Sequence, residues 1–403
     1  MDETQFSELA SWITEVGLAG RAETLMLTGF CERAVVAGLP LASGLVIIDT
    51  LHPTHEGHAF RWREDEAETK FIEYGSSHEG KAAETWRRSP FYRLLETGDS
   101  VLRRRWNPAA LAEFPSIKDM VPPGSTEYVA MISRFAAAGA IGEMDCVYLA
   151  WTTRRPGGFD DEAMAALRRL VPFLAIAMKC AALARVATNL VETYLGRGAG
   201  RLVLSGRIAR GVADRIEAVL WFSDLRGYTK ISDSSPPEEI VPLLNDYAEA
   251  VISAIHAEGG DVLKLIGDGV LAIFRVEDRK AACRSAIAAA LAADRAIEEL
   301  NQRRAGRNAP TTHMYLGLHR GEVYFGNIGS KDRLDFTVVG PAVNEVSRIG
   351  AMCRSLDQPV LTSAGFAEAL GDARPRLVSV GRYALRGVGR AQELFTIDPE
   401  DRR

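Results

Sequence analysis

The sequence predicts an α+β protein with two domains, and three observations support this prediction. At 403 residues the chain exceeds what one ordinary core accommodates. Hydrophobic residues make up 47% and charged residues 25%, which is typical of a soluble globular protein. Apolar runs of strand length are mixed with helical apolar stripes, and from about Ile216 strands and helices alternate regularly.

The first domain is predicted over residues 1–185. Apolar runs rich in β-branched and aromatic residues, each of strand length, occupy 43–51, 127–135 and 143–153. A helix is predicted from about 160 to 195, because acidic residues open it and an apolar stripe continues past Pro172. This layout resembles a GAF-type sensor domain, which implies an unknown small-molecule or ionic effector. An unrelated α+β domain that only dimerises is the alternative.

A histidine repeat interrupts this domain. His52, His55 and His58 recur every three residues in LHPTHEGHAF. Three converging imidazoles can hold a metal ion, although an exposed turn is the more common interpretation of such a run.

The second domain is predicted over residues 214–399, after a helical linker over 186–213. Its expected elements are a strand at 218–224, a helix with a stripe from Ile240 to Ile255, a hairpin of strands at 261–266 and 269–274, an alanine-rich helix over 278–304, and strands at 313–321 and 323–329. The order β-α-β-β-α-β is that of a ferredoxin-like fold.

Composition excludes several classes of function. The formal net charge of −5 argues against general nucleic-acid binding. The 5 cysteines are scattered without a CxxC pair, as in a reducing compartment. The N-terminus lacks the order of a signal peptide, and the apolar stretch from Leu170 to Val186 contains a proline and two cations. We therefore expect a cytoplasmic protein without a membrane span.

Two aspartates carry the predicted chemistry. Residues 220–229 read LWFSDLRGYT and residues 264–274 read KLIGDGVLAIF, so each apolar run delivers one aspartate, Asp224 or Asp268, to a glycine-containing turn. Carboxylates at neighbouring strand ends can hold a pair of Mg²⁺ ions against a polyphosphate. Either aspartate alone is more commonly a cap or turn residue.

A third segment, 335–349, reads DFTVVGPAVNEVSRI. If Pro341 lies in the first turn of a helix, Asn344 and Arg348 share one face. An amide and a guanidinium side by side suit a ribose oxygen and a charged phosphoryl group. A surface pair on an interface helix is the alternative.

Residues 214–399 resemble the catalytic domain of class III nucleotidyl (adenylyl) cyclases, which has a palm-type ferredoxin-like fold. FSDLRGYT is similar to the first metal-aspartate motif, KLIGDGVLAIF to the second, and VNEVSR to the asparagine–arginine motif. The resemblance implies that Asp224 and Asp268 bind two Mg²⁺ ions, for which Mn²⁺ can substitute. It also implies that Asn344 orients the ribose and that Arg348 neutralises charge at the α-phosphate.

The same resemblance implies the substrate contacts. Backbone N–H groups of Leu225, Arg226, Gly227, Tyr228 and Thr229 would cradle the phosphates, and Arg386 stands where many relatives carry a phosphate-binding lysine. Lys264 matches the adenine-selecting lysine, and Thr337 matches the threonine of class IIIb enzymes. A lysine can donate to adenine N1, and a threonine hydroxyl can accept from the 6-amino group.

The resemblance further implies a homodimer. Lys264 and Asp268 are expected on one strand, ~13 Å apart, and in this family they serve different sites between two catalytic domains. The linking helix is expected to pair as well. The expected function is an adenylyl cyclase that converts ATP to 3′,5′-cyclic AMP and pyrophosphate under control of the N-terminal domain. The alternatives are a cyclase for GTP or a pyrimidine nucleotide, and a catalytically silent signalling module.

Overall fold

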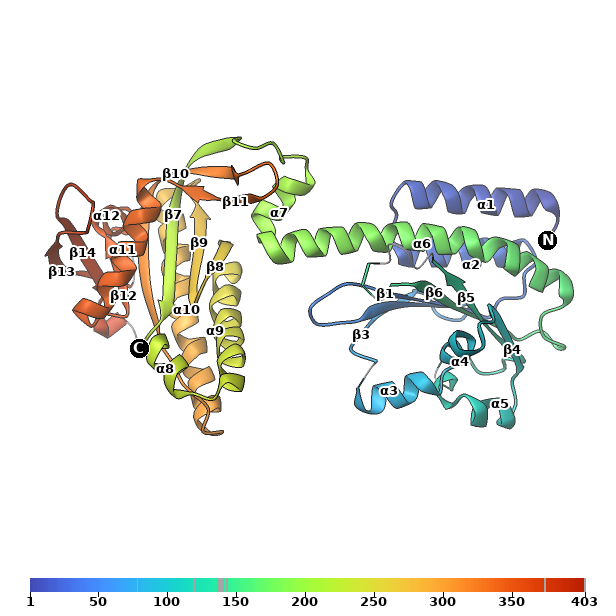
Figure 1. The fold of residues 1–403 in the computed structure, drawn as a ribbon. Coiled ribbons are helices and arrows are strands. Elements are labelled where there is room, and N and C mark those ends of the chain that lie inside the picture. The colour runs from blue at the N-terminus through green and yellow to red at the C-terminus, as the bar shows by residue number, and fades with distance from the viewer. Residues whose placement is uncertain (78, 119, 136–140, 143, 373–374, 402–403) are drawn as a thin grey trace. The chain divides into compact units, whose positions relative to one another are not determined.

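The computed structural model of the chain describes residues 1–77, 79–118, 120–135, 141–142, 144–372 and 375–401. It divides into two compact units, Met1–Leu190 and Val191–Arg403. Figure 1 colours the first unit from blue to green and the second from green to red. Each unit combines helices with one sheet, so the protein is of the α+β class.

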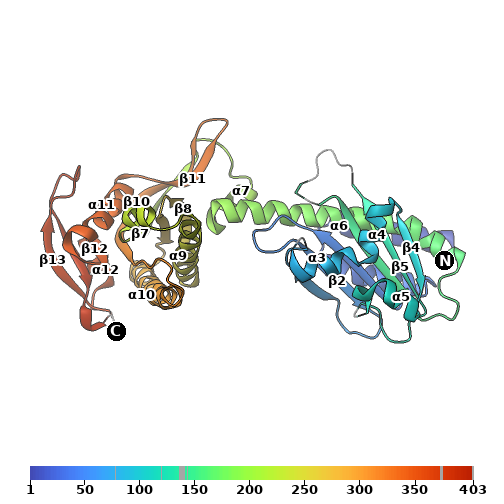
Figure 2. The same ribbon diagram turned by 60° about the horizontal axis from the view of Figure 1, so that its bottom comes forward.

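The first unit contains a six-stranded antiparallel sheet in the order β3-β2-β1-β6-β5-β4. Helices α1, α2 and α6 cover one face, and Figure 2 shows α3, α4 and α5 in front of the other. The elements are α1 (Glu3–Leu18), α2 (Glu23–Val36), β1 (Ser43–Asp49), β2 (Gly57–Arg63), β3 (Lys70–Tyr74), α3 (Gly80–Arg87), α4 (Pro90–Thr97), β4 (Val101–Arg105), α5 (Pro108–Glu113), β5 (Glu127–Arg134), β6 (Cys146–Thr153) and α6 (Asp161–Leu195).

Helix α6 is the long helix expected from the sequence. Its first turn is capped by the Asp160 carboxylate, which accepts the N–H of Ala163 at 2.8 Å. Among the described residues it is the one helix whose length and composition suffice to cross a membrane, although the sequence suggested that this stretch falls short. One face, including Leu167, Leu170 and Leu174, is fully buried in the core of the first unit. A core helix of a soluble protein passes the same test of length and composition.

The second unit contains a sheet in the order β13-β14-β12-β10-β7-β9-β8, with β11 paired to β10. Its elements are α7 (Arg197–Leu204), β7 (Ala213–Leu225), α8 (Tyr228–Ser234), α9 (Pro237–Ala257), β8 (Asp261–Ile266), β9 (Gly269–Arg275), α10 (Arg279–Ala305), β10 (Met314–Gly329), β11 (Leu334–Val339), α11 (Pro341–Leu356), β12 (Val360–Ser363), α12 (Ala364–Leu370), β13 (Leu377–Tyr383) and β14 (Gln392–Ile397). The two strands predicted at 313–321 and 323–329 form the single long strand β10.

Apolar side chains cover both faces of this sheet. Val219 and Trp221 of β7 point toward α9 and α10, which lie side by side in Figure 1. The alternate residues Ala218 and Leu220 point to the opposite face, where α11 packs. The central strand β7 is therefore buried on both faces, which fixes the position of the residues at its end.

Candidate active site

Asp224 and Asp268 come together where neighbouring strands of the sheet end. Asp224 lies at the end of β7, next to last in the strand. Asp268 lies in the two-residue turn between β8 and β9, where Gly267 adopts a φ of +62° that favours glycine. The backbone N–H of Leu225 donates to Asp268 Oδ2 at 3.2 Å, which joins the two strand ends directly.

The Asp224 carboxylate is in an unfavourable environment. Burial, together with the negative charge of Asp268, raises its pKa from 3.8 to about 6, although the charge of Arg354 on α11 opposes this shift. Asp224 Oδ1 is buried and has no hydrogen-bond partner among the described residues. A buried acceptor without a partner, beside a second carboxylate, fits a divalent cation with oxygen ligands.

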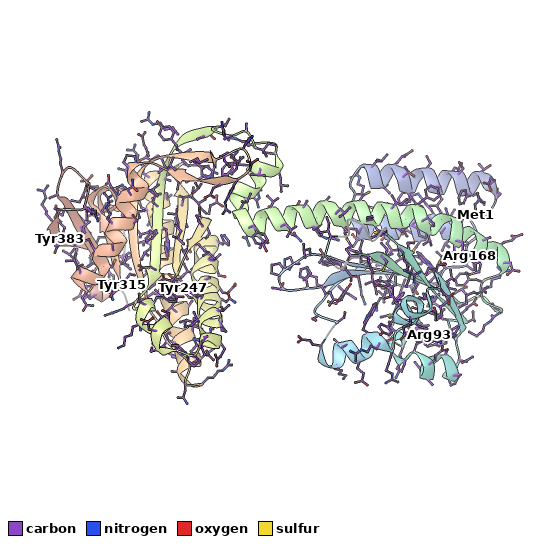
Figure 3. All side chains as sticks on the ribbon, in the orientation of Figure 1. Met1, Arg93, Arg168, Tyr247, Tyr315 and Tyr383 are labelled. Carbon is purple, nitrogen blue, oxygen red and sulfur yellow. The ribbon has the colours of Figure 1, made fainter. Side chains whose placement is uncertain are left out.

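Buried hydrogen bonds to Ser223, the residue before Asp224, support the end of β7. The Trp221 Nε1–H donates to Ser223 Oγ at 2.9 Å, and the Tyr247 hydroxyl donates to the same oxygen at 3.2 Å. Tyr247, labelled in Figure 3, extends from α9, and burial raises its pKa. These bonds hold the residue before Asp224 in one position, so the carboxylate is presented by a fixed backbone.

The loop after Asp224 differs from the predicted phosphate cradle. The N–H of Leu225 is used by Asp268, and the N–H of Arg226 donates to the carbonyl of His313 at 2.8 Å. Both N–H groups have protein partners in this conformation, and their binding of phosphate stays a prediction. Gly227, Tyr228 and Thr229 follow at the start of α8, with Gly227 at a φ of +75°.

Asn344 and Arg348 lie one turn apart on α11. The prediction that Pro341 occupies the first turn is confirmed, because α11 begins at this residue. Asn344 is exposed and Arg348 is half-buried. The loop that carries the exposed Arg386 approaches Arg348 closely, since a Cβ built on Gly387 would lie 3.0 Å from the guanidinium Nη1. Arg348 and the Arg386 loop are thus brought together.

Lys264 and Thr337 are linked through a residue that the sequence reasoning missed. The Lys264 ammonium forms an ion pair with Asp335 on β11. Asp335 and Thr337 are two positions apart in this strand and point to the same side, whereas Phe336 between them is buried against Phe325. The segment DFT alternates polar, apolar and polar residues, and this pattern could have indicated that Asp335 lies on the same side of a strand as Thr337.

The expected placement of Lys264 and Asp268 on one strand is wrong. Strand β8 ends at Ile266, so Asp268 belongs to the turn. The register of β8 shifts between Val262 and Lys264, as in a β-bulge, and is regular from Lys264 to Ile266.

The predicted site residues therefore form three separate groups within one chain. The charge of Arg354, near the end of α11, lowers the pKa of Asp224. Asn344 lies ten residues earlier in the same helix, about 15 Å along its axis. Among the described residues, no hydrogen bond or ion pair connects the two aspartates with Asn344 or Arg348. A single unit holds the carboxylate pair but does not bring the asparagine–arginine pair to it.

The two carboxylates form a site whose residues fit divalent cations. Comparison with known proteins identifies the family. The family described as "Adenylate and Guanylate cyclase catalytic domain" matches residues 213–398. This part of the chain belongs to that family, as a class III catalytic domain.

Individual proteins are similar to part of this chain. An adenylate cyclase of Anabaena cylindrica is 35% identical over 144 residues, which cover 36% of this chain and 29% of that protein. Adenylate cyclase 1 of Rhizobium meliloti is 29% identical over 200 residues, or 46% of this chain and 30% of that protein. The chain thus spans about a third of the length of the curated relatives it matches. Among solved structures, the adenylyl cyclase CyaB from P. aeruginosa is 23% identical, with a TM-score of 0.44 over 47% of this chain and 98% of that one.

Proposed function

We propose that the chain is an adenylyl cyclase that converts ATP to 3′,5′-cyclic AMP and pyrophosphate at sites shared between two copies. The observation that carries this proposal is the half-buried pair Asp224 and Asp268, set apart from Asn344 and Arg348 on α11. The buried oxygen Asp224 Oδ1 has no partner among the described residues and fits a cation. A head-to-tail pair of catalytic units would place the aspartates of one copy opposite α11 of the other.

The residues have complementary roles in this reaction. Asp224 and Asp268 would hold two Mg²⁺ ions, which activate the ribose 3′-hydroxyl and neutralise charge on the triphosphate. Asn344 of the second copy orients the ribose by hydrogen bonds. Arg348 of that copy stabilises charge that grows on the α-phosphate, a contribution that can reach a few kcal/mol, and Arg386 adds positive charge from the neighbouring loop.

Lys264 and Thr337 support adenine as the base. The ammonium can donate to adenine N1, while guanine N1 already carries hydrogen and would face another donor. The hydroxyl of Thr337 can accept from the 6-amino group. Asp335 forms an ion pair with the Lys264 ammonium and points to the same side of β11 as Thr337. Asp335 therefore orients the lysine that would donate to the base.

The linking helix supplies a second dimer contact in this proposal. Among the exposed residues of α6, six follow one another at spacings of three, four or seven positions: Phe173, Ile176, Cys180, Ala184, Ala187 and Tyr194. Ile176 is 64% exposed and Tyr194 is 81% exposed. An exposed stripe with this period is typical of a two-stranded coiled coil.

The first unit acts as the regulatory domain in this proposal. A cavity of about 1010 Å³ opens between its sheet and helices α3 and α4, which is the size of a small-molecule site. Apolar and aromatic side chains such as Trp86, Phe91 and Tyr148 line it, with Asp49 and Glu56 among the polar groups. We infer that an effector binds there and controls the catalytic unit through α6.

The first test is product analysis. Purified protein is incubated with ATP, GTP, CTP or UTP and with Mg²⁺ or Mn²⁺, and the products are identified by mass spectrometry. Cyclic AMP alone, abolished by Asp268→Ala, is the expected result. A different cyclic nucleotide would overturn the roles of Lys264 and Thr337, and absence of any product with each metal and with the α6 dimer intact would favour a silent signalling module.

The second test addresses the shared site. Asp224→Ala and Asn344→Ala protein should each be inactive, and a mixture should recover activity because mixed dimers contain one intact site. Subunit exchange is verified with differently tagged copies. If exchange occurs and no activity returns, the site is not shared.

A further inference from the structure

Four polar side chains gather where strands β2 and β3 meet the loop after β1. His52 and His55 belong to this loop, His58 lies on β2, and Glu73 lies on β3. His58 and Glu73 are direct partners in the antiparallel register, so their side chains point to the same face of the sheet. The sequence indicated only the histidine repeat; the fourth residue comes from strand pairing.

Three of these residues converge on one point. The ligand atoms of His55, His58 and Glu73 all lie within 4.8 Å of one another. His58 Nε2 is 3.9 Å from Glu73 Oε1, and the rings of His55 and His58 meet edge to face with centroids 4.9 Å apart. The more common interpretation of the repeat as an exposed turn is wrong for His58, which is only 2% exposed.

Two ring nitrogens in this cluster lack partners. His58 Nδ1 and His55 Nε2 are buried and make no hydrogen bond with any described residue. A buried polar group without a partner is energetically unfavourable. Two unpartnered imidazole nitrogens in a cluster that also holds a carboxylate fit a ligand that accepts imidazole lone pairs.

Neighbouring groups orient the rings. The Thr54 hydroxyl lies 3.5 Å from His55 Nδ1, and Nε2 is the nitrogen of that ring that lacks a partner among the described residues. His52 stacks on His55 with ring centroids 3.8 Å apart, and its Nδ1 accepts the N–H of Thr54 at 3.3 Å. Contacts to the far side of a ligating imidazole are common around metal ions.

One cation and one anion act on the cluster. Arg185 of α6 lies over the ring of Phe60, which neighbours His58. Its guanidinium forms an ion pair with Glu23 at 2.5 Å, and burial together with the Arg185 charge lowers the pKa of His58. Glu73 then supplies the negative charge that a cation requires.

We propose that His55, His58 and Glu73 bind one divalent first-row transition metal ion, with Zn²⁺ as the reference ion, at a site separate from the two aspartates of the second unit. Two imidazoles and one carboxylate favour Zn²⁺, Co²⁺ or Ni²⁺ over Mg²⁺, which prefers oxygen ligands. Metal–ligand distances of about 2.0–2.2 Å require the three atoms to move closer. Glu73 permits this, because its side chain is 56% exposed on an edge strand.

The ion would fasten the loop after β1 to the edge strand β3. Residues 70–73 of β3 are exposed, and this edge strand pairs with the sheet along one side only, through β2. The next residue, Tyr74, and Glu56 of the loop both line the large cavity of the first unit. Metal occupancy therefore stiffens one wall of that cavity.

The test uses the absorption of Co²⁺, which reports coordination by imidazole nitrogen, in titrations of the full chain. We expect one equivalent with a tetrahedral d–d spectrum. His55→Ala and Glu73→Gln should each weaken binding at least 10-fold, as loss of one ligand does. Glu68→Gln is the matched control on the same hairpin, and Asp268→Ala removes the other metal site; neither should change the spectrum.

Each outcome decides the proposal. A spectrum that persists in both His55→Ala and Glu73→Gln protein, or that disappears in Asp268→Ala protein, overturns it, as does absence of a tetrahedral spectrum. Hydrogen exchange gives an independent result: Zn²⁺ should slow exchange of β3 amides in the unmodified chain and in Glu68→Gln, and should have no effect in Glu73→Gln. His58→Ala is avoided because this buried residue also supports packing.

Discussion

Replacing Asp224 by asparagine should stabilise the metal-free catalytic unit. The pKa of Asp224 is raised from 3.8 to about 6 by burial and by the charge of Asp268. At pH 7 this shift corresponds to a penalty of at most about 3 kcal/mol for the ionised carboxylate in the folded state, and solvent screening lowers it because the group is only half-buried. Asp224→Asn removes that charge, so we expect the free energy of unfolding to rise by up to about 3 kcal/mol.

The sign of the pH dependence follows from the raised pKa. The penalty is fully present above pH 6, decreases as the carboxyl group takes up a proton, and is absent below pH 3.8. The difference in stability between Asp224→Asn and the unmodified chain should therefore close between pH 7 and about pH 4. Asp233→Asn, an exposed site on α8, is the control and should show no such difference.

Metal and nucleotide should remove most of this difference in stability. With Mg²⁺ and a non-hydrolysable ATP analogue at 100 times the dissociation constant, the unmodified chain should gain about 2.7 kcal/mol, whereas Asp224→Asn should gain little. Urea unfolding is carried out at one protein concentration and followed by hydrogen exchange of peptides from β7 and β9. These peptides are chosen because the chain has two units and they report on the catalytic one. A metal-free variant that is less stable at pH 7, or a gain that persists at pH 4, would refute the reasoning from a buried charge.

Three further predictions concern other contacts. Cys180 is exposed whereas the remaining four cysteines are buried, so a short bismaleimide should cross-link two copies through α6 and Cys180→Ser should prevent it; an active protein that never cross-links would contradict the helix pairing. Asp335→Asn releases Lys264 from its ion pair, and the ratio of kcat/KM for ATP to that for GTP should fall by about 10-fold, the effect of losing about 1.4 kcal/mol; an unchanged ratio would show that Asp335 does not orient the lysine. Gly387→Ala introduces a Cβ at a φ of +74° and 3.0 Å from Arg348, so kcat should decrease and stability should fall by about 1–2 kcal/mol; Gly389→Ala, with open space at its Cβ, is the control.

Local sequence determined much of the catalytic unit. The apolar run that ends at Asp224, the glycine turn that carries Asp268, and the helix that begins at Pro341 were all predicted, because each depends on the periodicity and turn residues of one short segment. The fixed spacing within α11 likewise placed Asn344 and Arg348 on one face.

Other features were decided by pairing between distant segments. The ion pair of Lys264 and Asp335 joins residues 71 positions apart, and the effect of Arg354 on Asp224 depends on how α11 packs against the sheet. The edge strand that brings Glu73 to His58 was not predicted, since its exposed side chains lack the apolar alternation of a strand. Sequence by itself thus determined which residues end each strand and share each helix face, because these follow from backbone geometry. Only the tertiary structure decided which of them meet, and which buried oxygens and nitrogens lack partners, because contacts across a sheet depend on register and packing rather than on neighbours in the chain.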